Sequence, residues 1–297
     1  MAAFSGTYTV MVTPFTPDGR KIEDAVLRDF VDWQIEEGIA GLIPLGSTGE
    51  FLSLSYEERC QVADVVIRQA RGRVPVLIGA GAENPLEAAR FGREVETLGA
   101  DGLLIIPPFY SSPTEEEIFQ HYLCIGEAVS IPIMLYNNPA ITNIDMQPAL
   151  IARLANVPNV AYVKESTLDV TRVRDIVRLA GDRLGVFGGV LGFESFLNGA
   201  TGWTAVGANV LPGDFQRMYE HSVVARDVDA AQALYRHLLP LIELVGGPRY
   251  VSATKMILAS MGWPVGPPRL PRLACTGAEL LWVERVVQEL NLTRKQQ

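Results

Sequence analysis

The sequence is poor in several features that commonly point to a function. It has only three cysteines in 297 residues, Cys60, Cys124 and Cys275, an odd number at wide spacing that disfavours a disulfide framework or a CxxC metal site. No apolar run reaches the roughly 20 residues that cross a bilayer, and the N-terminus lacks the basic and then apolar layout of a secretory signal. The formal net charge of −9 disfavours binding to phosphate backbones or anionic lipid. We therefore expect a cytoplasmic protein with reduced thiols, which binds neither nucleic acid nor membrane.

Nucleotide and metal signatures are missing as well. No GxGxxG sequence follows an early strand pattern, and no GxxxxGK[ST] loop occurs. The three histidines, His121, His221 and His237, all fall in helical patterns, so we expect neither a histidine and carboxylate metal cluster nor a Ser-His-Asp triad. The sequence thus implies no metal and no organic cofactor.

Short β-prone runs alternate with longer amphipathic segments through about the first 200 residues, as in a parallel sheet. About eight strands, each followed by a helix, match the repeat and size of a (β/α)8 TIM barrel. A doubly wound open sheet is the alternative, although its usual nucleotide signatures are absent. The expected strands cover residues 8–13, 41–45, 76–78, 102–106, 133–136, 160–164, 185–187 and 203–206, and the expected helices 22–37, 56–70, 85–98, 114–129, 148–155 and 171–180.

The pattern becomes purely helical after the last expected strand. We expect residues 1–212 to form the barrel and residues 213–297 to form a C-terminal helical extension packed on it. The helical segments of this extension cover 215–225, 228–245, 250–260 and 278–290, with a proline-rich linker at 263–271.

One lysine ends an expected strand. The chain has four lysines, and Lys21, Lys255 and Lys295 lie in a loop, a C-terminal helix and the tail. Active sites of such barrels form where the strands end, so Lys164 is the candidate. Desolvation there would lower its pKa and leave a free amine able to attack a carbonyl, as in a Schiff-base lysine. The alternative is an ion pair with a neighbouring carboxylate such as Glu165.

Hydroxyl groups end other expected strands. Tyr136 closes the fifth run, and because consecutive strands are neighbours its phenol would face Lys164 and could move a proton. The Gly-Ser-Thr-Gly turn at 46–49 exposes backbone N–H groups near a helix start, where Ser47 and Thr48 could hold a 2-oxo acid's carboxylate and relay protons. Packing for the tyrosine and a tight turn with a capping hydroxyl are the plainer explanations.

Two further strand ends carry weaker signals. Tyr110 is another phenol at the same rim, where packing or an interface would also explain it. Gly188 begins a glycine-rich end of the seventh strand, which allows either close substrate approach or simple turn geometry.

Four motifs stand in order at the ends of expected strands. They are Gly-Ser-Thr-Gly-Glu at 46–50, Pro-Pro-Phe-Tyr at 107–110, Leu-Tyr-Asn-Asn-Pro at 135–139 and Val-Lys-Glu-Ser at 163–166. Together they resemble the dihydrodipicolinate synthase and N-acetylneuraminate lyase family over nearly the whole chain. The resemblance implies a class I lyase of aldolase, dehydratase or deaminase type, which acts on pyruvate or a pyruvate-derived 2-oxo acid. It also implies that Lys164 forms the imine and that Tyr136 transfers protons.

The resemblance assigns further roles. It implies that Ser47 and Tyr110 complete a hydroxyl relay with Tyr136, and that the Thr204 carbonyl lies near the lysine. In many members the tyrosine at the Tyr110 position comes from a partner subunit, in a homotetramer built as a dimer of dimers. The residues expected to contact the substrate are Thr48, Gly49, Ile141, Gly188 and Thr204.

Ile141 is a departure from the family pattern. Dihydrodipicolinate synthases similar to this chain carry an arginine there, which grips the carboxylate of the second substrate, and an apolar side chain cannot supply that bidentate contact. The Pro-Ala-x-Thr form at 139–142 resembles branches that cleave or dehydrate sugar-derived 2-oxo acids or deaminate cyclic imino acids. Two alternatives remain, a dihydrodipicolinate synthase of lysine biosynthesis with another carboxylate grip, and a catalytically silent barrel that binds 2-oxo acids.

Overall fold

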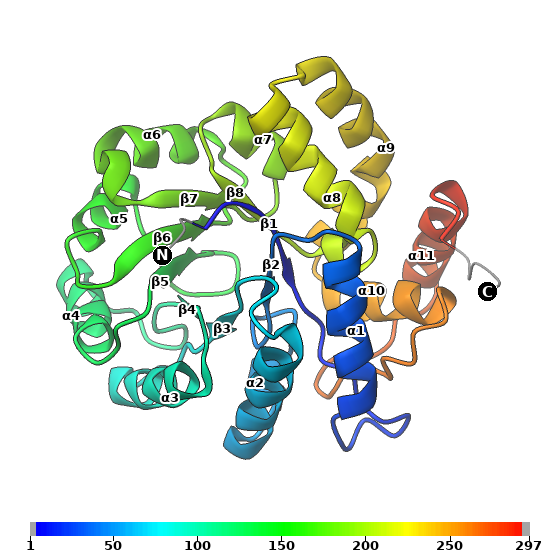
Figure 1. Ribbon diagram of the computed structural model, residues 1–297, viewed down its shortest axis with the longest axis horizontal. Helices are drawn as coiled ribbons and strands as arrows, with labels where there is room; N and C mark the ends of the chain where they lie inside the picture. The colour runs from blue at the N-terminus through cyan, green and yellow to red at the C-terminus, as the bar shows by residue number, and fades with distance from the viewer. Residues whose placement is uncertain (1–3, 293–297) are drawn as a thin grey trace.

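The computed structural model describes residues 4–292. Its eight strands are parallel and follow the order β2-β1-β8-β7-β6-β5-β4-β3, and a bridge between Leu42 and Val76 joins β2 to β3. Helices surround the strands on the outside (Figure 1), so the expected (β/α)8 barrel is confirmed. The strands are β1 Gly6–Val10, β2 Gly41–Ile43, β3 Leu77–Gly79, β4 Gly102–Ile105, β5 Ile133–Asn137, β6 Val160–Glu165, β7 Gly185–Gly188 and β8 Gly202–Ala205.

The helices agree closely with the amphipathic segments, with one exception. The six-residue helix α7, Gly192–Leu197, was not expected from the sequence, since it is too short to show a clear period. Phe193 and Phe196 of this helix are buried. The others are α1 Asp24–Glu36, α2 Tyr56–Ala70, α3 Pro85–Leu98, α4 Glu115–Gly126, α5 Pro148–Leu154, α6 Thr171–Ala180, α8 Pro212–Tyr219, α9 Val228–Gly246, α10 Tyr250–Ser260 and α11 Ala278–Glu289.

Helix α8 completes the eighth unit of the barrel. It packs against β1, where the Thr7 hydroxyl donates to the Phe215 carbonyl at 2.8 Å and the Thr7 N–H donates to Gln216 at 2.9 Å. Helices α9, α10 and α11 follow and lie on one side of the barrel (Figure 1). A division into domains at 212/213 would place all of α8 except Pro212 in the extension, and this boundary stays a prediction.

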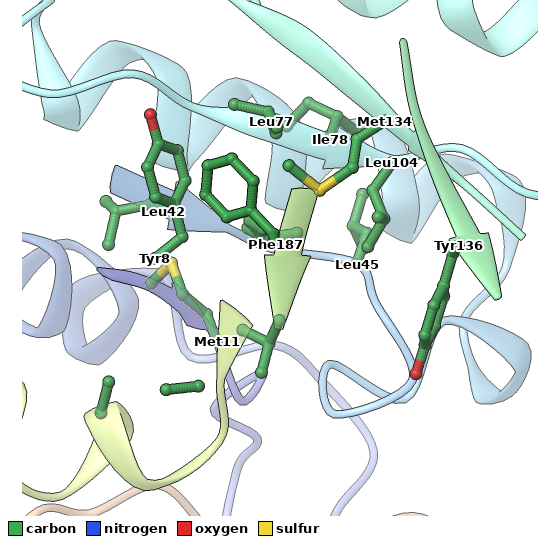
Figure 2. Close-up of a cluster of buried hydrophobic side chains, with 14 of the residues drawn as sticks. Tyr8, Met11, Leu42, Leu45, Leu77, Ile78, Leu104, Met134, Tyr136 and Phe187 are labelled. Atoms are coloured by element: carbon green, nitrogen blue, oxygen red, sulfur yellow. The ribbon is translucent and has the colours of Figure 1, made fainter. Parts of the chain in front are cut away.

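Apolar side chains fill the barrel interior. Figure 2 shows this cluster, in which Phe187 from β7 stands edge-on to Tyr8 with ring centroids 5.4 Å apart. Tyr136 lies at the edge of the cluster, so the packed interior forms the floor beneath the strand ends. This floor is apolar and buried, which lowers the polarity around any polar group placed on it. Its labelled members are Tyr8, Met11, Leu42, Leu45, Leu77, Ile78, Leu104, Met134, Tyr136 and Phe187.

Capping fixes the helices that follow the site loops. Helix α2 starts with a capping box formed by Ser55 and Glu58, and α4 starts with one formed by Thr114 and Glu117. Such a cap contributes on the order of 1 kcal/mol and sets where a helix begins. The loops after β2 and β4, which carry Ser47 and Tyr110, therefore end at fixed points.

Candidate active site

Lys164 and Tyr136 form the centre of the site. The register of β5 and β6 places these two residues directly opposite each other. The Lys164 Nζ lies 4.1 Å from the centroid of the Tyr136 ring, and only 7% of the lysine is exposed. The strand-end lysine and tyrosine predicted to face each other do so.

Burial lowers the pKa of Lys164 to about 7, and no charged neighbour contributes to this shift within residues 4–292. Side chains alternate along a strand, so Glu165 points away from its neighbour. Its carboxylate accepts hydrogen bonds from Asn137 Nδ2 at 2.9 Å and from the Thr167 N–H at 2.8 Å. The alternative of an ion pair between Lys164 and Glu165 is thus not what the structure contains, and much of the lysine is a neutral amine near pH 7.

The Tyr136 phenol is surrounded by hydrogen-bonding groups. Burial raises its pKa, and this effect is opposed by the Asn138 amide and by the hydroxyls of Ser47 and Ser166. The Asn138 Nδ2 donates to the phenol oxygen at 3.0 Å. Because its pKa is raised, the phenol is protonated at neutral pH, and its partners provide short routes for a proton.

The turn after β2 lies beside this phenol. The Gly49 N–H donates to the Gly46 carbonyl at 3.0 Å, and Thr48 is buried. A Cβ on Gly49 would lie 2.9 Å from the Leu45 nitrogen, so the tight turn requires glycine. A pocket between this turn and β5 is lined by Ser47 and Tyr136 together with Leu45, Gly46, Phe51, Gly79, Gly81, Leu104 and Ile106.

The remaining predicted residues lie at different distances from this centre. Gly188 ends β7, and its carbonyl accepts a hydrogen bond from the hydroxyl of buried Thr204 on β8 at 3.1 Å. Ile141 is 44% exposed in the loop after β5. Tyr110 is 85% exposed, and its backbone N–H donates to Glu83. Its exposed phenol is not enclosed in the site of its own chain, so a role in a relay stays a prediction.

Two residues near the site come from the C-terminal segment and were missed from the sequence. Tyr250 begins α10, and burial raises its pKa, to which the nearby Tyr136 phenol adds. The Arg272 guanidinium and the Ser47 hydroxyl lie close enough to the Tyr250 phenol to oppose that rise in its pKa. No local pattern could have found this contact, because it depends on how α10 packs on the barrel.

The described residues also bear on metal binding and on membrane insertion. Between residues 4 and 292, no three His, Cys, Asp or Glu side chains are gathered as metal ligands would be. None of the helices in that range is both long and apolar enough to cross a membrane.

Comparison with known proteins gives consistent results. The model of the dihydrodipicolinate synthetase family matches residues 3–290. A 4-hydroxy-tetrahydrodipicolinate synthase from Pelobacter propionicus is 37% identical over 238 residues, which cover 80% of this chain and 81% of the relative. Another from Syntrophus aciditrophicus is 34% identical over 291 residues, which cover 97% and 99% of the two chains.

Solved structures agree as well. A chloride-inhibited dihydrodipicolinate synthase from Acinetobacter baumannii, complexed with pyruvate, has a TM-score of 0.92 and 31% identity, with 98% of this chain and 100% of that chain covered. The dihydrodipicolinate synthase from Aquifex aeolicus has a TM-score of 0.94 and 26% identity, with 99% and 100% covered.

A poorly solvated strand-end lysine beside a buried phenol, at the rim of a (β/α)8 barrel, defines a Schiff-base-forming lyase of the class I aldolase type. The matches over the whole chain narrow this class. The protein belongs to the dihydrodipicolinate synthetase family, as the four motifs indicated.

Proposed function

We propose that Lys164 forms an imine with pyruvate or a pyruvate-derived 2-oxo acid, and that this imine is the intermediate of a lyase reaction. The observation that carries the proposal is the buried Lys164 amine, 4.1 Å from the Tyr136 ring centroid and with a pKa lowered to about 7. The name of the Acinetobacter structure, which contains pyruvate, supports this class of substrate.

The chemistry follows from the two side chains. The neutral Nζ adds to C2 of the 2-oxo acid, and the resulting carbinolamine loses its oxygen as water after Tyr136 supplies a proton. The protonated imine then draws electrons from C3, so that a proton or a carbon group on C3 can leave and an enamine remains. The tyrosinate formed in the first step is a strong base, because burial raises the pKa of Tyr136, and it can take the C3 proton.

The substrate would be held by the turn after β2 and by neighbouring strand ends. We assign its carboxylate to the backbone amides of Ser47 and Thr48 and to the Thr48 hydroxyl. Gly49 keeps this turn tight enough for the amides to converge, as its close approach to Leu45 indicates. Gly188 and Thr204, linked by their hydrogen bond, would border the reacting carbon.

Sodium borohydride trapping tests this function. A reduced adduct of pyruvate on Lys164, found by intact-mass and peptide analysis and missing in Lys164→Ala, is the expected result. Circular dichroism of Lys164→Ala shows whether its missing adduct reflects lost chemistry or misfolding. If the folded wild-type protein gives no adduct with pyruvate or any other 2-oxo acid, the imine mechanism is wrong and a silent binding barrel is the better explanation.

The names of the relatives favour one particular reaction as a second candidate, the synthesis of 4-hydroxy-tetrahydrodipicolinate. Apolar Ile141 stands against it, since it cannot grip a carboxylate. Incubation with pyruvate and aspartate semialdehyde separates the two: condensation at a rate typical of enzymes supports synthesis, and imine trapping without condensation supports another lyase.

We also propose a homotetramer in the cytoplasm. The exposed Tyr110 supports the assembly, because a phenol that faces away from its own site could enter that of a partner subunit. The oligomeric state can be read from sedimentation of the purified protein, and the location from fractionation of cells that make it.

A further inference from the structure

The C-terminal segment 267–274 is anchored on one side to α2 and to Glu50, which follows the turn after β2. The Arg269 guanidinium makes two bonds of 2.7 Å to the Glu58 carboxylate, and its backbone N–H donates to Glu50 at 2.7 Å. Glu50 follows the Gly-Ser-Thr-Gly turn and also pairs with buried Lys255 of α10 at 2.8 Å. The segment is therefore anchored next to the turn that carries Ser47.

The same segment is fixed to α10 on its other side. The Ser252 hydroxyl donates to the Leu273 carbonyl at 2.8 Å, and the Arg249 guanidinium donates to the carbonyls of Leu273 and Ala274 at 2.6 and 3.0 Å. Arg272 lies between the two anchors. Its backbone position is thus determined by contacts on both sides and does not depend on its own side chain.

The Arg272 guanidinium has no acidic partner among the described residues. It is half-buried, and none of the ion pairs found between residues 4 and 292 involves it, whereas Arg269, three residues earlier, is paired with Glu58. The guanidinium lies near the Tyr250 phenol, as does the Ser47 hydroxyl, since both lower the pKa of that phenol. A partly desolvated guanidinium is costly without a counter-ion, so its place beside the site suits an anion that arrives from outside.

We propose that Arg272, oriented by Tyr250, binds a second anionic group on the substrate, a carboxylate at the far end of a dicarboxylic 2-oxo acid. The inference rests on the proposed imine chemistry and names the substrate class. Ile141 offers no polar contact for such a group, and the guanidinium fork of Arg272 matches a carboxylate. Selectivity would thus come from the C-terminal segment instead of the loop after β5.

Paired acids that differ only in the distal group test this inference. The probes are 2-oxopentanedioate against 2-oxopentanoate, 2-oxohexanedioate against 2-oxohexanoate, and pyruvate, each trapped with borohydride over a concentration series. The wild-type protein should prefer at least one diacid over its matched monoacid. In Arg272→Gln the half-saturating concentration of that diacid should rise about 10- to 100-fold, the usual loss of a charge-assisted bidentate contact, while pyruvate trapping changes less than about twofold.

Two variants complete the test. Arg272→Lys keeps the charge but not the fork, so it should retain part of the diacid preference. Arg178→Gln, which removes an exposed arginine on α6, should behave as wild type. Equal losses for monoacids and diacids in Arg272→Gln, or no wild-type preference for any diacid, would overturn the role of Arg272 and leave the imine mechanism standing. No adduct with any acid in wild type would overturn both.

Discussion

Lys164 is charged in the unfolded chain at neutral pH and is buried in the folded one. The pKa therefore falls from an ordinary value of 10.5 to about 7 on folding, and the cause is burial. Desolvation of this kind favours a nucleophile and opposes stability, as is common for catalytic groups.

Replacement of the lysine should stabilise the protein in a way that depends on pH. Between pH 7 and 10.5 the unfolded chain binds more protons at this site than the folded one, so wild-type stability gains up to about 1.4 kcal/mol per pH unit relative to Lys164→Met. The advantage of Lys164→Met should be complete below pH 7 and vanish towards pH 10.5. Urea unfolding of both proteins at pH 6, 8 and 10 measures it, and a difference independent of pH would contradict the assigned cause.

Loss of the Tyr136 hydroxyl should slow proton transfer. In D2O the enamine exchanges the C3 hydrogens of pyruvate, which proton NMR follows without knowledge of the natural second substrate. We expect Tyr136→Phe to exchange about 10²- to 10⁴-fold more slowly than wild type, the usual contribution of a positioned acid or base. Tyr219→Phe on α8 is the matched control, and equal exchange in both variants would exclude Tyr136 from the transfer.

At the scale of elements, a buried ion pair joins the barrel to the C-terminal helices. Glu50 follows the turn after β2 and Lys255 lies on α10, with Nζ and Oε1 2.8 Å apart and both side chains almost fully enclosed. The ammonium approaches the oxygen off the ideal direction, so this is an ion pair first and a hydrogen bond second. Burial lowers the pKa of Lys255 to about 8, and Glu50 opposes this effect.

Replacing only Lys255 should lower the free energy of unfolding more than replacing both members of this ion pair. Lys255→Met leaves the Glu50 carboxylate buried without its cation, which we expect to lower the free energy of unfolding by roughly 3–5 kcal/mol. The double variant Glu50→Gln with Lys255→Met should recover a large part of the loss, because Gln can still accept the Arg269 N–H. Urea unfolding of the wild type, Lys255→Met, Glu50→Gln and the double variant decides it, and an additive double variant would mean that the two side chains do not interact.

The sequence pattern predicted the barrel strands well, and it predicted the contacts of the C-terminal segment with the site less well. Apolar runs that end in Tyr136 and Lys164 predicted both the strands and their neighbouring positions, because a parallel barrel fixes which ends meet. Tyr250 and Arg272 were out of reach, since they approach the site through helix packing that no short spacing encodes. Helix α7 was missed because six residues carry too little periodicity.

At the scale of the whole molecule, the exposed Tyr110 predicts shared sites. If its phenol enters a partner's site, as in many members of the family, Tyr110→Phe and Lys164→Ala should each be nearly inactive. Subunits of the two variants, unfolded together and reassembled, should regain activity, because a mixed pair contains one site with both native residues. The C3 exchange of pyruvate measures this. Recovery no greater than the sum of the separate variants would place Tyr110 outside the chemistry.

The join between β2 and β3 has fewer paired residues than any other pair of neighbouring strands in the barrel. One bridge, Leu42 with Val76, stands there, whereas β5 and β6 pair over five positions. Pro75 and Pro44 accept hydrogen bonds across this join but have no N–H to return. Thermal breathing of the barrel, and the earliest exchange of backbone amides, should therefore start at this join. Since the turn with Ser47 leaves from β2, the weakest strand pairing among residues 4–292 lies beside the residues that we propose to hold the substrate.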